Sequence, residues 1–103
     1  LDQNEPALKI LAVLVGQFRT WLWVRLLLDQ GERDPKVIAQ KAEIGNPNRV
    51  YFLQKEVGSL KTTALLKAMQ QLLQLEYNLK QGQPERDAFQ EALIQIAAIL
   101  QKS

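Results

Sequence analysis

Apolar residues recur every three or four positions along most of the chain, and prolines and glycines divide this pattern into five segments. Pro6, Pro35, Pro47 and Pro84 stand where helices can begin, because the first turn of a helix tolerates proline. No segment alternates between apolar and polar residues as a half-buried strand would. The pattern therefore predicts an all-α fold, a bundle of five helices. Their expected ranges are about 5–30, 35–43, 47–57, 60–81 and 84–101.

Residues that cap helices support these boundaries. Asp34 and Asn46 stand directly before two of the prolines, and their side-chain oxygens can accept a hydrogen bond from a backbone N–H of the first turn. Glycine adopts the left-handed conformation that commonly ends a helix. Glycines follow four of the five segments: Gly31, Gly45, Gly58 and Gly82.

The last two predicted helices are amphipathic, and each presents one apolar stripe. We interpret these stripes as core positions rather than as a cofactor site, because the opposite faces carry glutamine and charge. The first stripe consists of Leu65, Met69, Leu72, Leu73 and Leu79. The second consists of Phe89, Ala92, Leu93, Ile96 and Leu100.

The first predicted helix is apolar on almost every side, which indicates burial on more than one side. Either it runs through the centre of the fold or a partner covers its outer face. Its length also raises the question of a membrane span. However, Gln17, Arg19 and Arg25 interrupt it, and each arginine would cost roughly 2.5–3.5 kcal/mol at the centre of a bilayer. We therefore expect no membrane partner.

Composition limits the classes of function that remain. The 103 residues suit a single domain, 1–103, with 47% apolar and 23% charged residues and a net charge of +2. The chain begins at Leu1 rather than at methionine, so we expect a fragment of a longer protein. Cysteine and histidine are absent, which excludes disulfides and the usual zinc ligands and suits the cytoplasm.

No set of residues predicts catalysis, a metal or a cofactor. Without histidine or cysteine, a nucleophile and its base would have to come from serine, lysine, tyrosine or carboxylates alone. Ser59 and the carboxylates near helix ends have simpler roles as helix-terminal residues. Residues 58–62 superficially resemble a phosphate-binding loop, but the required adjacent Gly-Lys pair and the preceding strand are missing. We therefore expect a chain with no catalytic site.

The stretch 34–56 has the outline of a helix-turn-helix, which leaves open a DNA-binding domain of a regulator. Asn48, Arg49, Phe52 and Lys55 would then point from the second helix toward DNA. Residues 36–67 hold six Lys or Arg against two Glu, which suits a phosphate backbone. However, Glu43 stands where the usual turn has glycine. Pairs of helices like this one are also common in bundles that never contact DNA.

Four stretches carry a resemblance to a known family. They are LKILAVLVGQFRTWLWVRLLLDQG, VIAQKAEIGNPNRVYFLQKEV, LLQLEYNLKQG and QPERDAFQEAL. Together they resemble the C-terminal domain of the delta subunit of bacterial DNA polymerase III, part of the sliding-clamp loader. The most specific feature is Glu76 followed by Leu79, Lys80 and Gly82. Family members often have Asp at this acidic position, and an aromatic residue where this chain has Gly58.

The resemblance implies a non-catalytic assembly domain of the collar type, which packs with the collar domains of the gamma/tau and delta-prime subunits during DNA replication in the cytoplasm. It also implies that the sliding clamp is contacted only through N-terminal domains that this chain lacks. Phe18, Trp21 and Trp23 are the candidate subunit contacts, because aromatic residues dominate binding hot spots. Arg49 and Lys55 are the candidate contacts to the backbone of primer–template DNA.

Overall fold

The computed structural model describes residues 5–101, and this part of the chain contains five helices and no strand. The all-α fold expected from the sequence is confirmed, with helix ends within about two residues of the expected ones. The helices are α1 (Glu5–Asp29), α2 (Pro35–Lys41), α3 (Asn48–Val57), α4 (Thr62–Lys80) and α5 (Glu85–Gln101).

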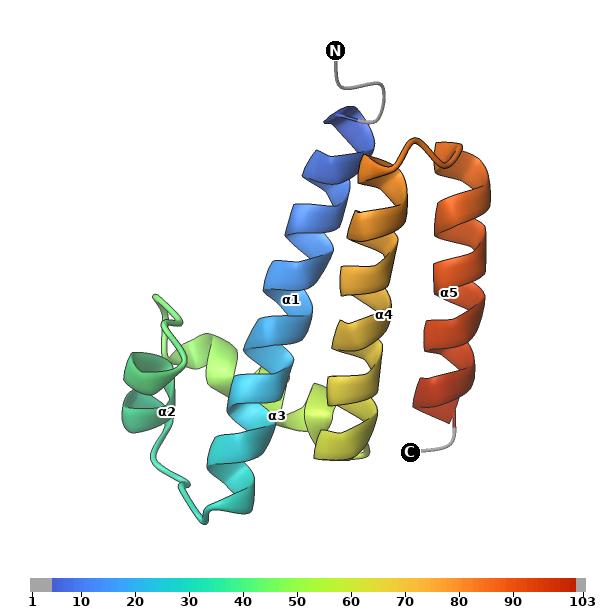
Figure 1. The fold of residues 1–103 in the computed structure, drawn as a ribbon. Coiled ribbons are helices and arrows are strands. Elements are labelled where there is room, and N and C mark those ends of the chain that lie inside the picture. The colour runs from blue at the N-terminus through green and yellow to red at the C-terminus, as the bar shows by residue number, and fades with distance from the viewer. Residues whose placement is uncertain (1–4, 102–103) are drawn as a thin grey trace.

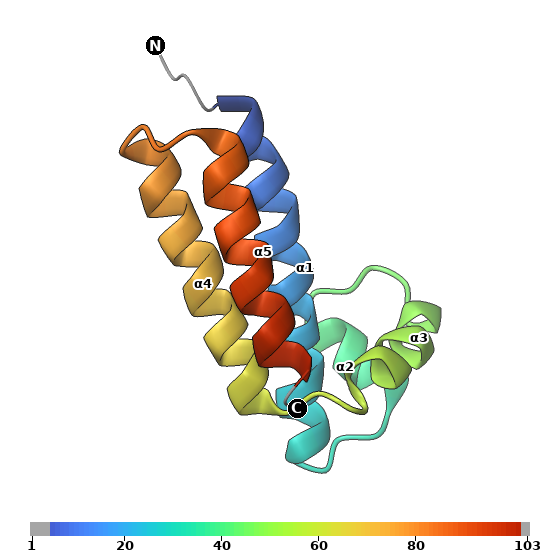
Figure 2. The ribbon, with the colours of Figure 1, turned by 90° about the vertical axis from the view of Figure 1, so that its right-hand side faces the viewer.

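The three long helices form one bundle, and the two short helices lie against the C-terminal half of α1 (Figures 1 and 2). Helix α4 packs against both α1 and α5, whereas α3 packs against α1 and α2. The resulting shape is long and thin, about 45 × 29 × 17 Å. Helix α1 therefore joins the long-helix bundle to the short-helix pair.

Each of these two parts has its own hydrophobic core. In the long-helix bundle, α1 contributes Leu11 and Phe18 to a core with α4 and α5. Farther along, the same helix contributes Val24 and Leu27 to a second core with α2 and α3. Trp21 packs against both cores. The expectation that the first helix is buried on more than one side is confirmed.

Helix α1 also passes the length and hydropathy test for a membrane span, over Glu5–Asp29. The central helix of a water-soluble bundle passes the same test, and this helix packs against α2, α3 and α4. Its outer side still exposes large apolar side chains, of which Val13 has the largest exposed fraction, 73%. Internal packing therefore accounts for only part of the apolar surface of α1.

Local side-chain chemistry explains where the helices begin and end. The Asp34 side chain accepts a 3.0 Å hydrogen bond from the backbone N–H of Lys36 at the start of α2. Asn46 Oδ1 accepts one of the same length from the N–H of Asn48 at the start of α3. Gly31 and Gly82, each with a φ of 92°, follow α1 and α4, in the left-handed conformation that glycine adopts easily.

Two residues that the apolar stripes placed in the core are instead exposed. Leu73 is 55% exposed, although Leu72 beside it is almost fully buried. Successive residues are rotated by about 100° around a helix, so Leu73 turns to the edge of α4. Leu93 is half exposed on α5 for the same reason, while its neighbour Ala92 is buried.

Candidate interaction surfaces

A small polar cluster sets the orientation of α3 relative to the long helices. Arg25 binds Oδ1 of Asp29 through Nε at 3.0 Å and through Nη2 at 2.8 Å. Its Nη1 donates a 3.0 Å hydrogen bond to the carbonyl oxygen of Val57, at the end of α3. The other oxygen of Asp29 accepts a 2.6 Å hydrogen bond from Thr62 Oγ1, at the start of α4. The cluster therefore ties α1 to both ends of the α3–α4 connection.

Hydrogen bonding in this cluster also shifts the acidity of one group. The hydrogen bond from Thr62 is the main cause that lowers the pKa of Asp29 below its ordinary value of 3.8, and Arg25 adds to the effect. Asp29 is consequently held in its charged form, which matches its position beside a guanidinium group.

Two of the three predicted aromatic contacts lie inside the chain. Phe18 is 8% exposed and belongs to the core of the long-helix bundle. Its ring meets that of Trp21 edge to face, with ring centroids 5.0 Å apart. The indole N–H of Trp21 donates a 2.9 Å hydrogen bond to Glu56 Oε1, which links α1 to α3. Phe18 and Trp21 are thus occupied by contacts within this domain.

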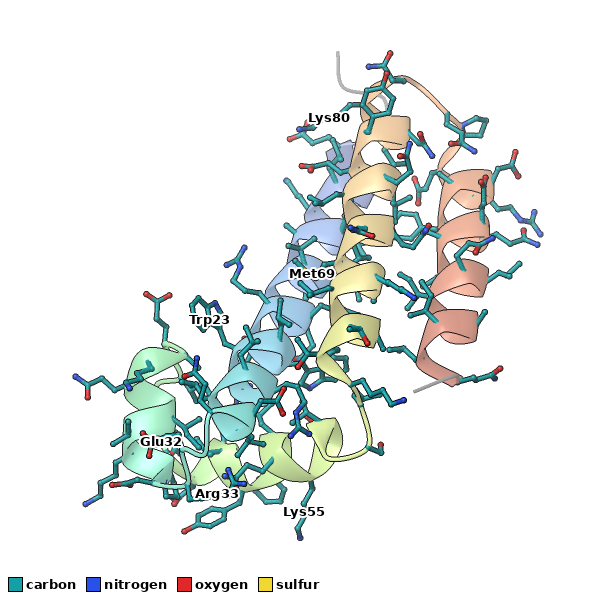
Figure 3. The ribbon with its side chains drawn as sticks, turned by 60° about the horizontal axis from the view of Figure 1, so that its bottom comes forward. Trp23, Glu32, Arg33, Lys55, Met69 and Lys80 are labelled. Carbon is teal, nitrogen blue, oxygen red and sulfur yellow. The ribbon has the colours of Figure 1, made fainter. Side chains whose placement is uncertain are left out.

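Trp23 has a different environment. Its side chain is 47% exposed and projects from α1 (Figure 3). It lines a hollow of about 370 Å³ between α1 and the end of α2, together with Gly16, Arg19, Thr20, Lys41, Ala42 and Glu43. Among the three aromatic residues, Trp23 is the most exposed, Trp21 is partly buried and Phe18 is buried. Their subunit contacts stay predictions.

Several exposed apolar residues were not predicted from the sequence as subunit contacts. Leu66, Leu73 and Tyr77 recur at helical spacing along one edge of α4, and we call them the α4 stripe. Ile10 and Val13 are exposed on the N-terminal half of α1, where Ile10 and Phe89 line a cavity of about 590 Å³ between α1 and α5. These residues belong to helices with many apolar positions, so the sequence pattern could not show which of those positions would be exposed to solvent.

The outer face of α3 combines aromatic and basic side chains. Tyr51 is 55% exposed and Phe52 is 67% exposed. Arg49 and Lys55 are exposed as well, and Lys55 projects from the helix into solvent (Figure 3). Within residues 5–101, neither cation forms a salt bridge. We call Arg49, Tyr51, Phe52 and Lys55 the α3 face.

The connection between α2 and α3 differs from that of a DNA-reading helix-turn-helix. It spans residues 42–47, whereas the motif uses a turn of about three or four residues. Glu43 has a φ of 58°, the only positive value among the described residues other than glycine. Glu43 thus supplies the left-handed residue that ends α2, and Gly45, which follows two residues later, does not have a positive φ. This geometry disfavours the regulator hypothesis.

Two features of the described part of the chain bear on metal and nucleotide binding. In residues 5–101, no group of three Asp, Glu, His or Cys side chains comes close enough together to bind a metal ion. Gly58 caps the C-terminus of α3, and Lys61 caps the N-terminus of α4. Residues 58–62 therefore join two helices, whereas a phosphate-binding loop follows a strand.

Fold and surfaces together define a small all-helical module with exposed apolar side chains, the class of domain that works by contact with other macromolecules. Residues 1–96 match the family described as DNA polymerase III delta subunit, C-terminal domain, and the chain belongs to that family. Membership supports a role in the clamp loader. No curated protein matches the chain, and no solved structure does.

Proposed function

We propose that this chain is the assembly domain that holds the delta subunit in the clamp loader by packing with the collar domains of the gamma/tau and delta-prime subunits. It would act without a catalytic site of its own, in the cytoplasm and away from the membrane. The sliding clamp would be contacted only by other domains of the delta subunit. Family membership supports the clamp loader as the complex to which the chain belongs. The exposed apolar surface of α1 supports binding through contacts between apolar surfaces.

The observation that carries this proposal is the contrast within α1. Different sides of the helix pack into the two cores, while Val13, Ile10 and Trp23 remain exposed. Monomeric proteins rarely leave large contiguous apolar patches uncovered, and such patches mark contact sites. The α4 stripe adds further exposed apolar surface. These side chains would become buried when neighbouring collar domains assemble.

Substitutions can test which surface makes the contact. Val13→Glu places a charge on the exposed side of α1, where the backbone and both cores are untouched. We expect it to abolish capture of the chain by immobilised gamma/tau and delta-prime collar domains. Ile94→Glu makes the same change on α5, at a side chain that is also exposed, and should leave capture intact. Equal loss in both variants, or in neither, would contradict the assignment to α1.

A second proposal concerns DNA. Arg49 and Lys55 lie on α3 without ion-pair partners in the described chain, as candidate contacts for the backbone of primer–template DNA. Removing both charges by Arg49→Ala with Lys55→Ala should weaken binding of the chain to DNA and reduce its salt dependence. Unchanged affinity in this double variant would count against the contact.

A further inference from the structure

We propose that the short-helix pair, α2 and α3, opens away from the long-helix bundle as one unit while the bundle stays folded. A polar latch holds the pair closed against α1. It consists of the hydrogen bond from Trp21 to Glu56 and the hydrogen bond from Arg25 to the carbonyl oxygen of Val57. This motion is a property of the domain itself, independent of the assembly role and of the DNA contact.

The buried side chains of residues 5–101 form two clusters that share no member. Every buried residue of the first cluster lies on α1, α4 or α5. The second cluster joins Val24 and Leu27, near the end of α1, to α2, α3 and the connection between them. Separation of the pair would therefore expose the second core and leave the buried contacts of the first core in place.

The bundle is the part that can stay folded by itself. Helix α2 has 7 residues and α3 has 10, and isolated helices shorter than about 12–15 residues are marginal in water. The pair also needs Val24 and Leu27 of α1 to complete its core. By contrast, α4 has 19 residues and packs against both α1 and α5. The pair is consequently the unit with the lower free energy of opening.

The latch crosses the boundary between the two parts. Trp21 Nε1 donates a 2.9 Å hydrogen bond to Glu56 Oε1, and Arg25 Nη1 donates a 3.0 Å hydrogen bond to the carbonyl oxygen of Val57. Both donors lie on α1 and both acceptors lie on α3, so both bonds would break on opening. Trp21 also packs against both cores, which places its ring at the boundary itself.

Two short connections attach the pair to the bundle. They span residues 30–34, after α1, and residues 58–61, before α4. The bundle residues beside them, Asp29 and Thr62, are joined by a 2.6 Å hydrogen bond. Because both residues belong to the bundle, this bond would persist in the opened protein. It would hold the two attachment points together while the pair moves.

Native-state hydrogen exchange, followed by NMR on the whole chain, tests this with two matched substitutions. Conditions are chosen so that the exchange rate of each amide reports its opening equilibrium. Ile38→Val trims the second core, and Ile96→Val makes the same change in the first core. The two side chains are 0% and 5% exposed. In the unchanged protein, we expect amides of α2 and α3 to exchange faster than those of α4 and α5.

The two variants should differ in a way that stepwise opening produces. Ile96→Val destabilises the closed and the opened protein alike, because the bundle is folded in both. It should speed exchange in α4 and α5 about fivefold and leave α2 and α3 unchanged. Ile38→Val destabilises the closed protein alone. It should therefore speed exchange in all four helices, again about fivefold.

A second pair of variants tests the latch. Glu56→Ala removes the acceptor of the Trp21 hydrogen bond, and we expect it to speed exchange in α2 and α3 about fivefold. Lys55→Ala makes the same kind of change at an exposed neighbour on α3 that forms no salt bridge within residues 5–101. It should change these rates by less than about twofold.

Three results would overturn the inference. Equal acceleration of α2, α3, α4 and α5 by both isoleucine variants would show that the domain opens as a whole. Slower exchange in α2 and α3 than in α4 and α5 would show that the pair is not the part that opens first. An unchanged rate in Glu56→Ala would show that the Trp21 hydrogen bond does not act as a latch. Capture by collar domains and binding to DNA are separate measurements, so none of these results alters those proposals.

Discussion

Thr62 Oγ1 donates a 2.6 Å hydrogen bond to Oδ2 of Asp29, so the first residue of α4 is joined to the last residue of α1. The two residues are 33 positions apart in sequence. The bond holds the N-terminus of α4 beside the C-terminus of α1, with the end of α3 attached through Arg25. The geometry of the short-helix pair relative to the long bundle depends on this connection.

This hydrogen bond makes part of the stability depend on pH. Because the folded state lowers the pKa of Asp29 below 3.8, the contribution is fully present above that value. It is lost as the pH falls through the lowered pKa of the folded state. Thr62→Val removes the main cause of the shift. We expect urea unfolding to show a larger stability difference between the two proteins at pH 7 than at pH 2. A difference that stays constant with pH would contradict this origin.

Arg25 should matter more than its partly exposed position implies. Arg25→Ala removes one of the two hydrogen bonds to the carbonyl of Val57, the other coming from the backbone N–H of Leu60, and it removes the guanidinium partner of Asp29. Hydrogen bonds that involve a charged group contribute about 1.5–3 kcal/mol, and we expect a loss of stability in that range. Arg19→Ala changes an exposed arginine of the same helix and should alter stability by less than about 0.5 kcal/mol. Similar effects in both variants would show that the cluster has no special role.

Two adjacent leucines on α4 should differ strongly in how much stability the same substitution costs. Leu72 is 1% exposed in the core of the long-helix bundle, so Leu72→Ala should cost about 2–5 kcal/mol. Leu73 is at the exposed edge, and Leu73→Ala should change stability by no more than about 0.5 kcal/mol. Chemical denaturation of both variants measures the difference. A large loss for Leu73→Ala in the isolated chain would mean that this edge is buried by the chain itself.

Glu43 offers a site where a substitution should stabilise the protein. A residue with a side chain costs about 1–2 kcal/mol in the left-handed conformation, and glycine avoids most of this cost but loses more chain entropy on folding. We expect Glu43→Gly to raise the free energy of unfolding by about 0.5–1 kcal/mol. Glu43→Ala, which keeps a Cβ, should not. An equal change in the free energy of unfolding for both variants would show that the lost charge, and not the left-handed backbone conformation, causes the effect.

Local signals in the sequence predicted the helices well. Asp34 caps α2 through the side-chain hydrogen bond that its position suggested. Pro47 holds the N-cap position of α3, and Asn46 before it accepts a side-chain hydrogen bond from the N–H of Asn48. Gly31 and Gly82 end helices in the left-handed conformation. Caps and glycine turns act within a few residues, so a single sequence contains the information they need. The family resemblance was likewise carried by contiguous stretches, and the match over residues 1–96 confirms it.

Tertiary relationships were harder to predict. Phe18 and Trp21 were candidate contacts because of their size, with core packing as the alternative for each. The structure shows their rings edge to face, and Trp21 also donates a hydrogen bond to Glu56. The division of α1 between two cores depends on where α3 and α4 lie, which no local pattern specifies. For the same reason Leu73 and Leu93 were placed in the core, whereas the structure leaves them at exposed edges. Residues on the border of an apolar stripe can turn either way, and packing decides between the two.

The most direct test of the account is the mass of the complex that this chain forms. Size exclusion with light scattering should be carried out on the chain alone and then mixed with collar domains of the gamma/tau and delta-prime subunits. We predict a mixed complex that persists at moderate salt, because contacts between apolar surfaces are not screened as phosphate contacts are. Separate elution of the three components at every salt concentration would contradict the assembly role.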